Sequence, residues 1–346
     1  MRNKTARSSN GQRWTVAVAA LCTVGLGFTV MSWQVPFVIW SAGEVTDIYA
    51  PGGLSITGAE TYAVSGHLEV ASVTVSPPSV RLADAVSAFY SADRAVLPQA
   101  VSYPAGQPIS QVVIGEQPAE PQRSAEAAAL RLAGLPANRA ARVVSVATAG
   151  PSAGLLEPDD VITAVFATKV TSVAEFNQAV ATHSIGDTIQ LTVTRGGLPL
   201  ESQIDVVAQA SGSDQQTPSL GVTMTDSFVF DPVVVSNAPV SAGSGLMLAL
   251  AIYDLLTPGA LLGHLTVAGA GMVDANGVVS GVAGTNQRLQ AAQAAGATVF
   301  LLPASSCATV SLETGMTVVA VSSLQQAADS LRVLAAGGTS IPTCQT

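Results

Sequence analysis

The sequence predicts a multidomain protein in which an apolar N-terminal segment precedes three stretches that alternate strands and helices. Its 346 residues allow two or three domains at about 150 residues each. Charged residues make up 11% and apolar residues 48%, which excludes a disordered chain. The fold class expected is an N-terminal transmembrane helix, a small β-rich segment, a compact β-rich domain and a C-terminal α/β (α+β) domain.

The apolar segment predicts a membrane anchor. Trp14–Val30 is almost wholly apolar and the uncharged run continues to Ala42, which suits a bilayer crossing of about 20 residues. Three aromatic residues near its end fit an interfacial belt on the outer side: Trp33, Phe37 and Trp40. A cleaved signal peptide is the alternative. We expect an uncleaved anchor that contacts membrane lipid.

Charge is distributed unevenly along the chain. The net charge is −9, yet four basic residues precede the first acid, Glu44: Arg2, Lys4, Arg7 and Arg13. Positive residues flanking an anchor stay inside, so we expect a single-pass plasma-membrane protein with a cytoplasmic N-terminus and an extracytoplasmic bulk. The acidic remainder excludes a nucleic-acid partner, because phosphate binding requires a basic face.

Changes in composition divide the chain. The expected parts are a cytoplasmic arm at 1–13, the transmembrane anchor at 14–40, a β-rich extracytoplasmic segment at 44–118, a second domain at 124–210, a third domain at 218–337 and a tail at 338–346. The polar run Ser211–Thr217 is expected to be a flexible linker between the last two domains.

The second domain resembles a bacterial PDZ domain. A helix at 125–133 and a strand at 142–146 precede a small-residue turn with a leucine, a Pro-Asp-Asp triplet and an aliphatic strand, spanning Gly150–Ile162. Asp159 stands where the family has glycine, and Phe166-Ala167-Thr168 replaces its usual turn. The resemblance implies binding of an extended peptide or unfolded protein, with the peptide end held in a backbone nest near Ala133, Gly134 and Leu135.

The third domain alternates strands and helices. A helix at 245–256 stops at Thr257-Pro258-Gly259, and Asn276-Gly277 predicts a hairpin between strands at 265–273 and 278–282. A helix at 285–295 with Gly296 at its end, a strand at 298–302 and a helix at 323–335 follow.

Two runs in this domain resemble Lon-type proteolytic domains: Ser241–Gly259 and Gly277–Pro303. With an anchor and a PDZ-like domain in front, the order of parts is similar to bacterial membrane-anchored PDZ plus Lon-like (S16-type) serine peptidases. That family uses a Ser–Lys dyad, in which a lysine of lowered pKa activates the serine hydroxyl. The alignment puts Gly243 at the serine position and Arg288 at the lysine position.

The expected function is therefore a peptide- or protein-binding pseudopeptidase. Arginine is not a general base near neutral pH, and no lysine follows Lys169. Arg288 is either a solvated residue of a first helical turn or a fixed cation that meets a peptide carbonyl or carboxylate. A purely structural envelope role is a further alternative.

The enzyme alternative is an active, ATP-independent endopeptidase with a displaced serine. Ser244, or Ser241, would supply the hydroxyl, and His264, Asp254 or Asp274 the base. The plainer interpretation makes Ser244 a helix N-cap and His264 an ordinary residue at a strand end. No Walker A run is present, which excludes ATP binding, and no cofactor is expected.

Cysteine usage leaves one question open. Cys22 lies in the expected anchor, so Cys307 and Cys344 are the pair outside it. They either form a disulfide that ties down the tail or remain two buried thiols. Neither their number nor their spacing predicts a metal site.

Overall fold

The computed structural model describes residues 14, 17–21, 25, 29–91, 93–102, 119–195, 201–211, 214–230, 234–236, 243–310 and 315–344. The chain divides into two compact units. The first comprises Met1–Glu44 and Val73–Gly115, and the second comprises Val45–Ser72 and Glu116–Thr346. The segment expected at 44–118 thus contributes to both units, and the second unit contains everything expected at 124–210 and 218–337.

The expected membrane anchor is wrong. In the described part of the chain no helix is both long enough and apolar enough to cross a bilayer. Residues 17–21 and 29–31 are helical, whereas β1 (Gln34–Val35) and β2 (Phe37–Asp47) lie where the end of the anchor was expected. The single-pass plasma-membrane placement falls with the anchor. The arm at 1–13 and Cys22 lie outside the described residues.

Local chemistry explains why the end of the apolar run is a strand. Pro36 interrupts a helix, and aromatic and β-branched residues favour strands. Along β2, Val38 is fully buried. The Trp40 indole N–H donates to the Ser102 hydroxyl at 2.7 Å, so this side chain serves the protein's own packing instead of a lipid interface.

The first unit contains short antiparallel pairs. β1 pairs with β5 (Val80–Arg81), and β2 pairs with β6 (Arg94–Pro98). Helix α2 (Leu82–Phe89) lies between β5 and β6, and α3 (Gln99–Ser102) follows β6. Both β2 and β4 (His67–Val75) cross the boundary between the two units along the chain.

One sheet of the second unit is parallel and carries helices on both faces. Its strands run in the order β20 (Thr317–Val321), β19 (Val299–Pro303), β16 (Thr266–Gly269) and β4. Alternate side chains of these strands join two separate cores. Leu68 and Leu301 pack with helices α7 (Gly245–Leu256) and α9 (Leu324–Ala335), whereas Ala71 and Phe300 pack with α8 (Thr285–Ala295).

Short elements complete this part of the chain. β3 (Ser55–Thr57) pairs with β15 (Val234–Ser236), and β17 (Met272–Val273) forms the expected hairpin with β18 (Val279–Ser280). A 3₁₀ turn, η1 (Ala304–Thr309), follows β19. Helix α5 (Ala119–Leu132) packs on α7 through alanines that are buried in a shared core.

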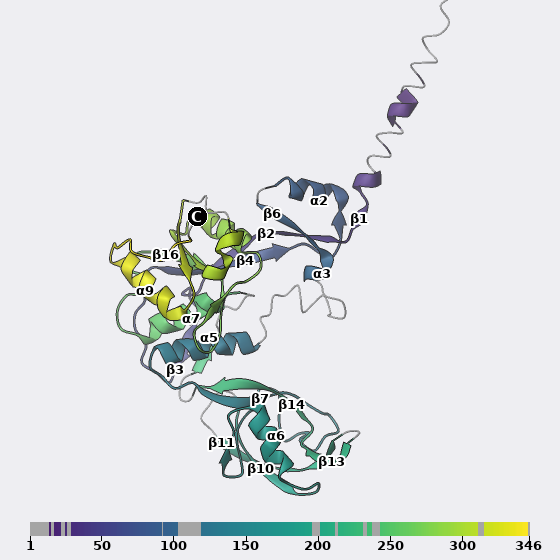
Figure 1. Ribbon diagram of the computed structural model, residues 1–346, viewed down its shortest axis with the longest axis vertical. Coiled ribbons are helices and arrows are strands. Elements are labelled where there is room, and N and C mark those ends of the chain that lie inside the picture. Colours follow the sequence, from purple (N-terminus) through teal and green to yellow (C-terminus); the bar gives the residue numbers. More distant parts are fainter. Residues whose placement is uncertain are drawn as a thin grey trace, which may run out of the picture. The chain divides into compact units, whose positions relative to one another are not determined.

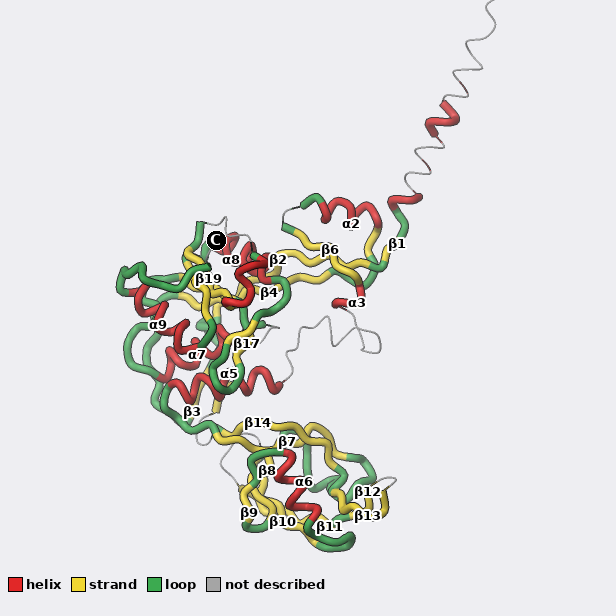
Figure 2. Tube along the Cα trace, in the orientation of Figure 1, coloured by secondary structure: helices red, strands yellow, loops and turns green. Residues whose placement is uncertain are grey.

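The second sheet of this unit is antiparallel. Its order is β11 (Glu201–Val207), β10 (Thr188–Thr194), β8 (Val161–Val165), β7 (Asn138–Val146) and β14 (Val222–Val229), with β9 (Thr168–Lys169) paired to β8. Helix α6 (Val173–Ala181) contacts β7, β8 and β14 (Figure 1). The expected boundary at 210 falls short, because β12 (Gln209–Ser211) and β13 (Asp214–Ser219) form a hairpin within the expected linker, and β14 completes the sheet (Figure 2).

The C-terminal tail lies on the edge of the parallel sheet. The Ala320 N–H of β20 donates to the Pro342 carbonyl at 2.9 Å. A disulfide joins Cys307 in η1 to Cys344, with the two Cα atoms 5.5 Å apart. The tail is therefore fixed both by a backbone bond and by a covalent bond.

Candidate functional site

The free side of β14 is the strongest candidate for a functional site. β14 pairs with β7 from Val222 opposite Val146 to Val229 opposite Asn138, and it ends the strand order of its sheet. Among the described strands, none pairs with its other side. An unpaired edge presents backbone donors and acceptors that can accept a further strand.

Hydrogen bonds at the two ends of β14 show which residues face outward. The Ala147 N–H donates to the Gly221 carbonyl at 2.9 Å, which makes Val222 and Val146 a pair that does not exchange hydrogen bonds. The N–H and C=O groups of Val222 therefore point away from β7. Because this direction alternates along a strand, the backbone groups of Met224 and Asp226 point outward too.

Helix α5 closes the far end of this edge. The Phe228 carbonyl accepts a hydrogen bond from the Arg123 guanidinium at 3.1 Å. The guanidinium of Arg123 also lies 5.8 Å from the centre of the Phe230 ring. The open edge, defined as Val222–Asp226, is thus bounded by a cation at its C-terminal end.

The side chains of the open edge face α6. Val222 and Met224 pack against the core that contains Phe176 and Val180 of this helix. Asp226 Oδ1 accepts a hydrogen bond from the Val173 N–H at 2.7 Å. One side of the open edge is thus lined by α6, which gives an added strand a second wall.

A tight turn precedes the open edge. Gly221 has φ +69°, and a Cβ there would lie 2.8 Å from Pro151 Cδ, so only glycine fits this position. The preceding Leu220 is buried, and its carbonyl accepts from the Ser152 hydroxyl at 2.6 Å. Backbone N–H groups around a left-handed residue form a concave anion site, and the Val222 N–H faces outward beside it.

The structure gives a different role to the nest expected at Ala133, Gly134 and Leu135. These residues end helix α5, with Gly134 at φ +78°. Their N–H groups donate to the carbonyls of Ala129, Arg131 and Leu130, in that order, at 2.8–3.1 Å. The three donors therefore already serve the helix end in the manner of a left-handed C-cap.

Sequence reasoning missed the turn and strand at 219–229. The available signal was Leu220-Gly221 followed by the alternating run from Val222 to Asp226. The two departures from the PDZ pattern affect turns. Asp159 and Phe166 both have positive φ, at 73° and 50°, and the Asp159 carboxylate pairs with Arg142.

The positions aligned with the family dyad are closed. Gly243 has φ +85°, and a Cβ there would lie 3.0 Å from the Val282 side chain. Arg288 is 5% exposed, and its Nη1 donates to the Ala71 carbonyl at 2.5 Å. Burial lowers the pKa of Arg288 to about 10, so the side chain remains protonated at neutral pH. It is a buried cation instead of a solvated residue of a first helical turn.

The fallback residues of the enzyme alternative are spread through the domain. Ser244 is 1% exposed and precedes α7, without the expected side-chain cap bond. Asp254 lies ten residues further along this helix, about 15 Å away, where it accepts from the Tyr49 hydroxyl and the Leu261 N–H. His264 is exposed before β16, whereas Gly243 contacts Gly271 after that strand ends.

The remaining candidates serve local structure. Asp274 accepts from the N–H groups of Asn276 and Val278 and so holds its own hairpin turn. Ser241 lies outside the described residues. The structure therefore does not bring Ser244 together with any of the three expected bases, and among the described residues no cluster of His, Cys, Asp or Glu could hold a metal ion.

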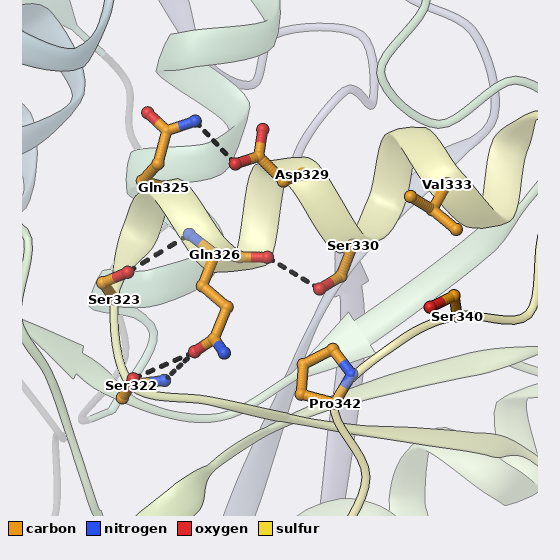
Figure 3. Close-up of a pocket in the computed structure, with 9 residues that line it drawn as sticks. All are labelled: Ser322, Ser323, Gln325, Gln326, Asp329, Ser330, Val333, Ser340 and Pro342. Carbon is orange, nitrogen blue, oxygen red and sulfur yellow. Dashed lines mark hydrogen bonds between the residues drawn. The ribbon is translucent and has the colours of Figure 1, made fainter.

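A polar groove of about 520 Å³ lies between α9 and the C-terminal tail. Figure 3 shows that its polar side chains bond to one another: Gln325 donates to Asp329, the Ser322 hydroxyl donates to Gln326, and Ser330 donates to the Gln326 carbonyl. Ser340 and Pro342 of the tail form the opposite wall. These internal bonds leave few groups to recognise a ligand.

An antiparallel sheet with a helix beside its end strand is the arrangement by which PDZ domains add a peptide strand. Residues 118–206 match the family model of the PDZ domain, so the chain contains a PDZ domain. The match ends before β14, which the structure adds to the same sheet. No curated protein matches the chain.

Solved PDZ structures also match. The PDZ domain of an SdrC-like protein from Listeria monocytogenes is 27% identical over 24% of this chain and 85% of that chain, with a TM-score of 0.23. That of an SdrC-like protein from Listeria innocua is 25% identical over 25% of this chain and 92% of that chain, also with a TM-score of 0.23. A protein from Geobacillus thermodenitrificans is 26% identical over 24% and 92%, with a TM-score of 0.22.

Proposed function

We propose that this protein binds the carboxyl-terminal end of an extended peptide as an added strand on the open edge, Val222–Asp226, between β14 and α6. The observation that carries the proposal is the outward direction of the backbone N–H and C=O groups at Val222, Met224 and Asp226. Backbone bonds to this edge supply affinity, and alternate side chains of the ligand contact α6.

The turn at Leu220-Gly221-Val222 is the place for the ligand's terminal carboxylate. Its left-handed glycine and the outward Val222 N–H supply the concave donors that an anion requires. The α6-facing residues next to it are apolar: Val222, Phe176 and Val180 belong to one hydrophobic cluster. A ligand with an apolar last side chain and a free carboxylate therefore fits the edge best.

The C-terminal domain, by its resemblance to Lon-type domains, belongs to a binding protein that lacks peptidase chemistry. Gly243 has no hydroxyl, and Val282 fills the space where a side chain would lie. Arg288 is held protonated against the Ala71 carbonyl and does not accept a proton at neutral pH. We therefore assign this domain the role of a pseudopeptidase that accompanies the PDZ domain.

Fluorescence anisotropy with labelled Gly-Gly-Ala-Thr-Val-Ser-Val tests the proposal. We expect saturable binding to the full chain, weakened about tenfold when the carboxylate is amidated, because hydrogen bonds to a charged group are lost. Met224→Pro removes an outward N–H without breaking the ladder to β7 and should abolish binding. Met224→Ala removes the same side chain, retains the N–H and should still bind.

Thermal unfolding of both variants shows whether they remain folded. Equal binding of the acid and the amide, or equal binding by Met224→Pro and Met224→Ala, would contradict this assignment of the ligand to the open edge.

A further inference from the structure

Asp226 is the charged residue on the open edge, and it lies at the far end from the carboxylate turn. We propose that Asp226 makes this protein prefer peptides with a lysine or arginine at the fifth position from the carboxyl terminus. This inference rests on the proposed function, because it assumes that the peptide adds to β14.

Strand register places that fifth residue beside Asp226. If the last residue of the ligand lies opposite Val222, its third residue from the end lies opposite Met224 and its fifth opposite Asp226. Residues directly opposite on neighbouring strands have Cβ atoms about 5 Å apart and side chains on the same face. The fifth side chain therefore lies on the α6 side of the sheet, next to the carboxylate of Asp226.

The carboxylate has capacity for a cation. Its one hydrogen bond from the described residues goes from the Val173 N–H to Oδ1, and it forms no salt bridge with them. On the other side of β14, Asp226 is paired with Ala141, which carries no charge. Asp226 is also exposed, so a long basic side chain reaches it without burying its own charge.

The next outward position sets a limit to the preference. The Phe228 carbonyl is occupied by the Arg123 guanidinium, so the open edge ends after Asp226 and a cation follows it. A basic residue two positions further from the carboxyl terminus would meet Arg123 and gain nothing. The preference is therefore confined to the fifth position.

Three peptides that differ only at this position test the inference: Gly-Gly-Lys-Thr-Val-Ser-Val and its Ala and Glu counterparts. Exposed ion pairs contribute little, so we expect the Lys peptide to bind about threefold more tightly than the Ala peptide and the Glu peptide to bind most weakly. The difference should vanish near 1 M salt, where the screening length falls to about 3 Å.

Asp226→Asn removes the charge and keeps an acceptor for the Val173 N–H, and it should bind the three peptides alike. Asp205→Asn, an exposed carboxylate on the opposite end strand β11, is the matched control and should retain the preference. Binding without preference in the wild type, or a preference that survives Asp226→Asn, would overturn this inference alone. If no free-carboxylate peptide binds, the proposed function fails and the inference fails with it.

Discussion

Arg288 illustrates what a single residue can reveal before and after folding. The sequence identifies it as a replacement at the aligned lysine position and leaves its surroundings open. Its acceptor is the Ala71 carbonyl, on a strand more than 200 residues earlier in the chain. Local sequence holds no signal for a contact at that separation, so burial of the guanidinium could not be predicted.

Gly243 provides a test of the closed dyad position. Gly243→Ser, alone or with Arg288→Lys, should produce no peptidase activity. It should also lower the free energy of unfolding by about 1–3 kcal/mol more than Gly259→Ser does. Both glycines have positive φ, but a Cβ at 259 meets nothing within 4 Å, whereas one at 243 meets Val282. Chemical denaturation and a fluorogenic peptide assay are the measurements, and cleavage by the double variant would refute the assignment.

Glu126 makes stability depend on pH. It is 5% exposed, and burial raises its pKa to about 7, against an opposing bond from Gln122. The folded state therefore binds this proton more tightly than the unfolded state, and stability falls as pH rises from about 4.5 to 7. Glu126→Gln should increase the free energy of unfolding at pH 8 by up to about 3 kcal/mol and leave it unchanged at pH 4.5.

Glu175→Gln is the control of opposite sign for that measurement. The Thr171 N–H lowers the pKa of the Glu175 carboxyl, so its contribution is present at high pH and is lost on acidification. Urea titrations at both pH values provide the comparison. A Glu126→Gln effect of equal size at pH 4.5 and pH 8 would show that its charge is not the cause.

Among the secondary structure elements, the helices were the easiest to predict. The expected spans at 245–256 and 285–295 coincide with α7 and α8, because Pro258 and Gly296 mark where these helices must end. β14 was missed for a physical reason. The polar residues before it are typical of a linker, and its partner β7 lies about 80 residues earlier, so only the folded register shows that the two belong together.

The position of β14 within the PDZ sheet predicts how fragments behave. A fragment of residues 136–230 should fold cooperatively, whereas one of residues 136–210 should not. Leu220, Val222 and Met224 belong to the same hydrophobic cluster as Phe176, and the shorter fragment lacks all three. Circular dichroism melting curves distinguish the two, and a cooperative transition in the shorter fragment would contradict the observed boundary.

The tail is the second element that invites a test. The disulfide between Cys307 and Cys344 closes a separation of 37 residues, which corresponds to a stabilisation of about 4 kcal/mol in the chain-entropy view. Cys344→Ser should lower the melting temperature and accelerate amide exchange at Ala320, which donates to Pro342 of the tail. Unchanged exchange at Ala320 would show that the backbone contact holds the tail without the covalent bond.

At the scale of the whole molecule, hydropathy was the misleading signal. The run through Trp40 was long enough for a membrane span, but its second half contains Pro36 and strand-favouring residues that pair within the first unit. The division into units was equally hidden. β4 joins the parallel sheet beside β16, so a segment near the N-terminus completes a fold that otherwise lies near the C-terminus.

The most direct test of the peptide-binding account is hydrogen-exchange mass spectrometry of the full chain with and without Gly-Gly-Ala-Thr-Val-Ser-Val. The account predicts slower exchange in fragments that cover Leu220–Asp226, since the outward N–H groups of Val222, Met224 and Asp226 gain acceptors in the peptide. Exchange at Ala133–Leu135 should not change, because those N–H groups are already bonded within the end of α5. Protection at 133–135 with none at 220–226 would contradict the account.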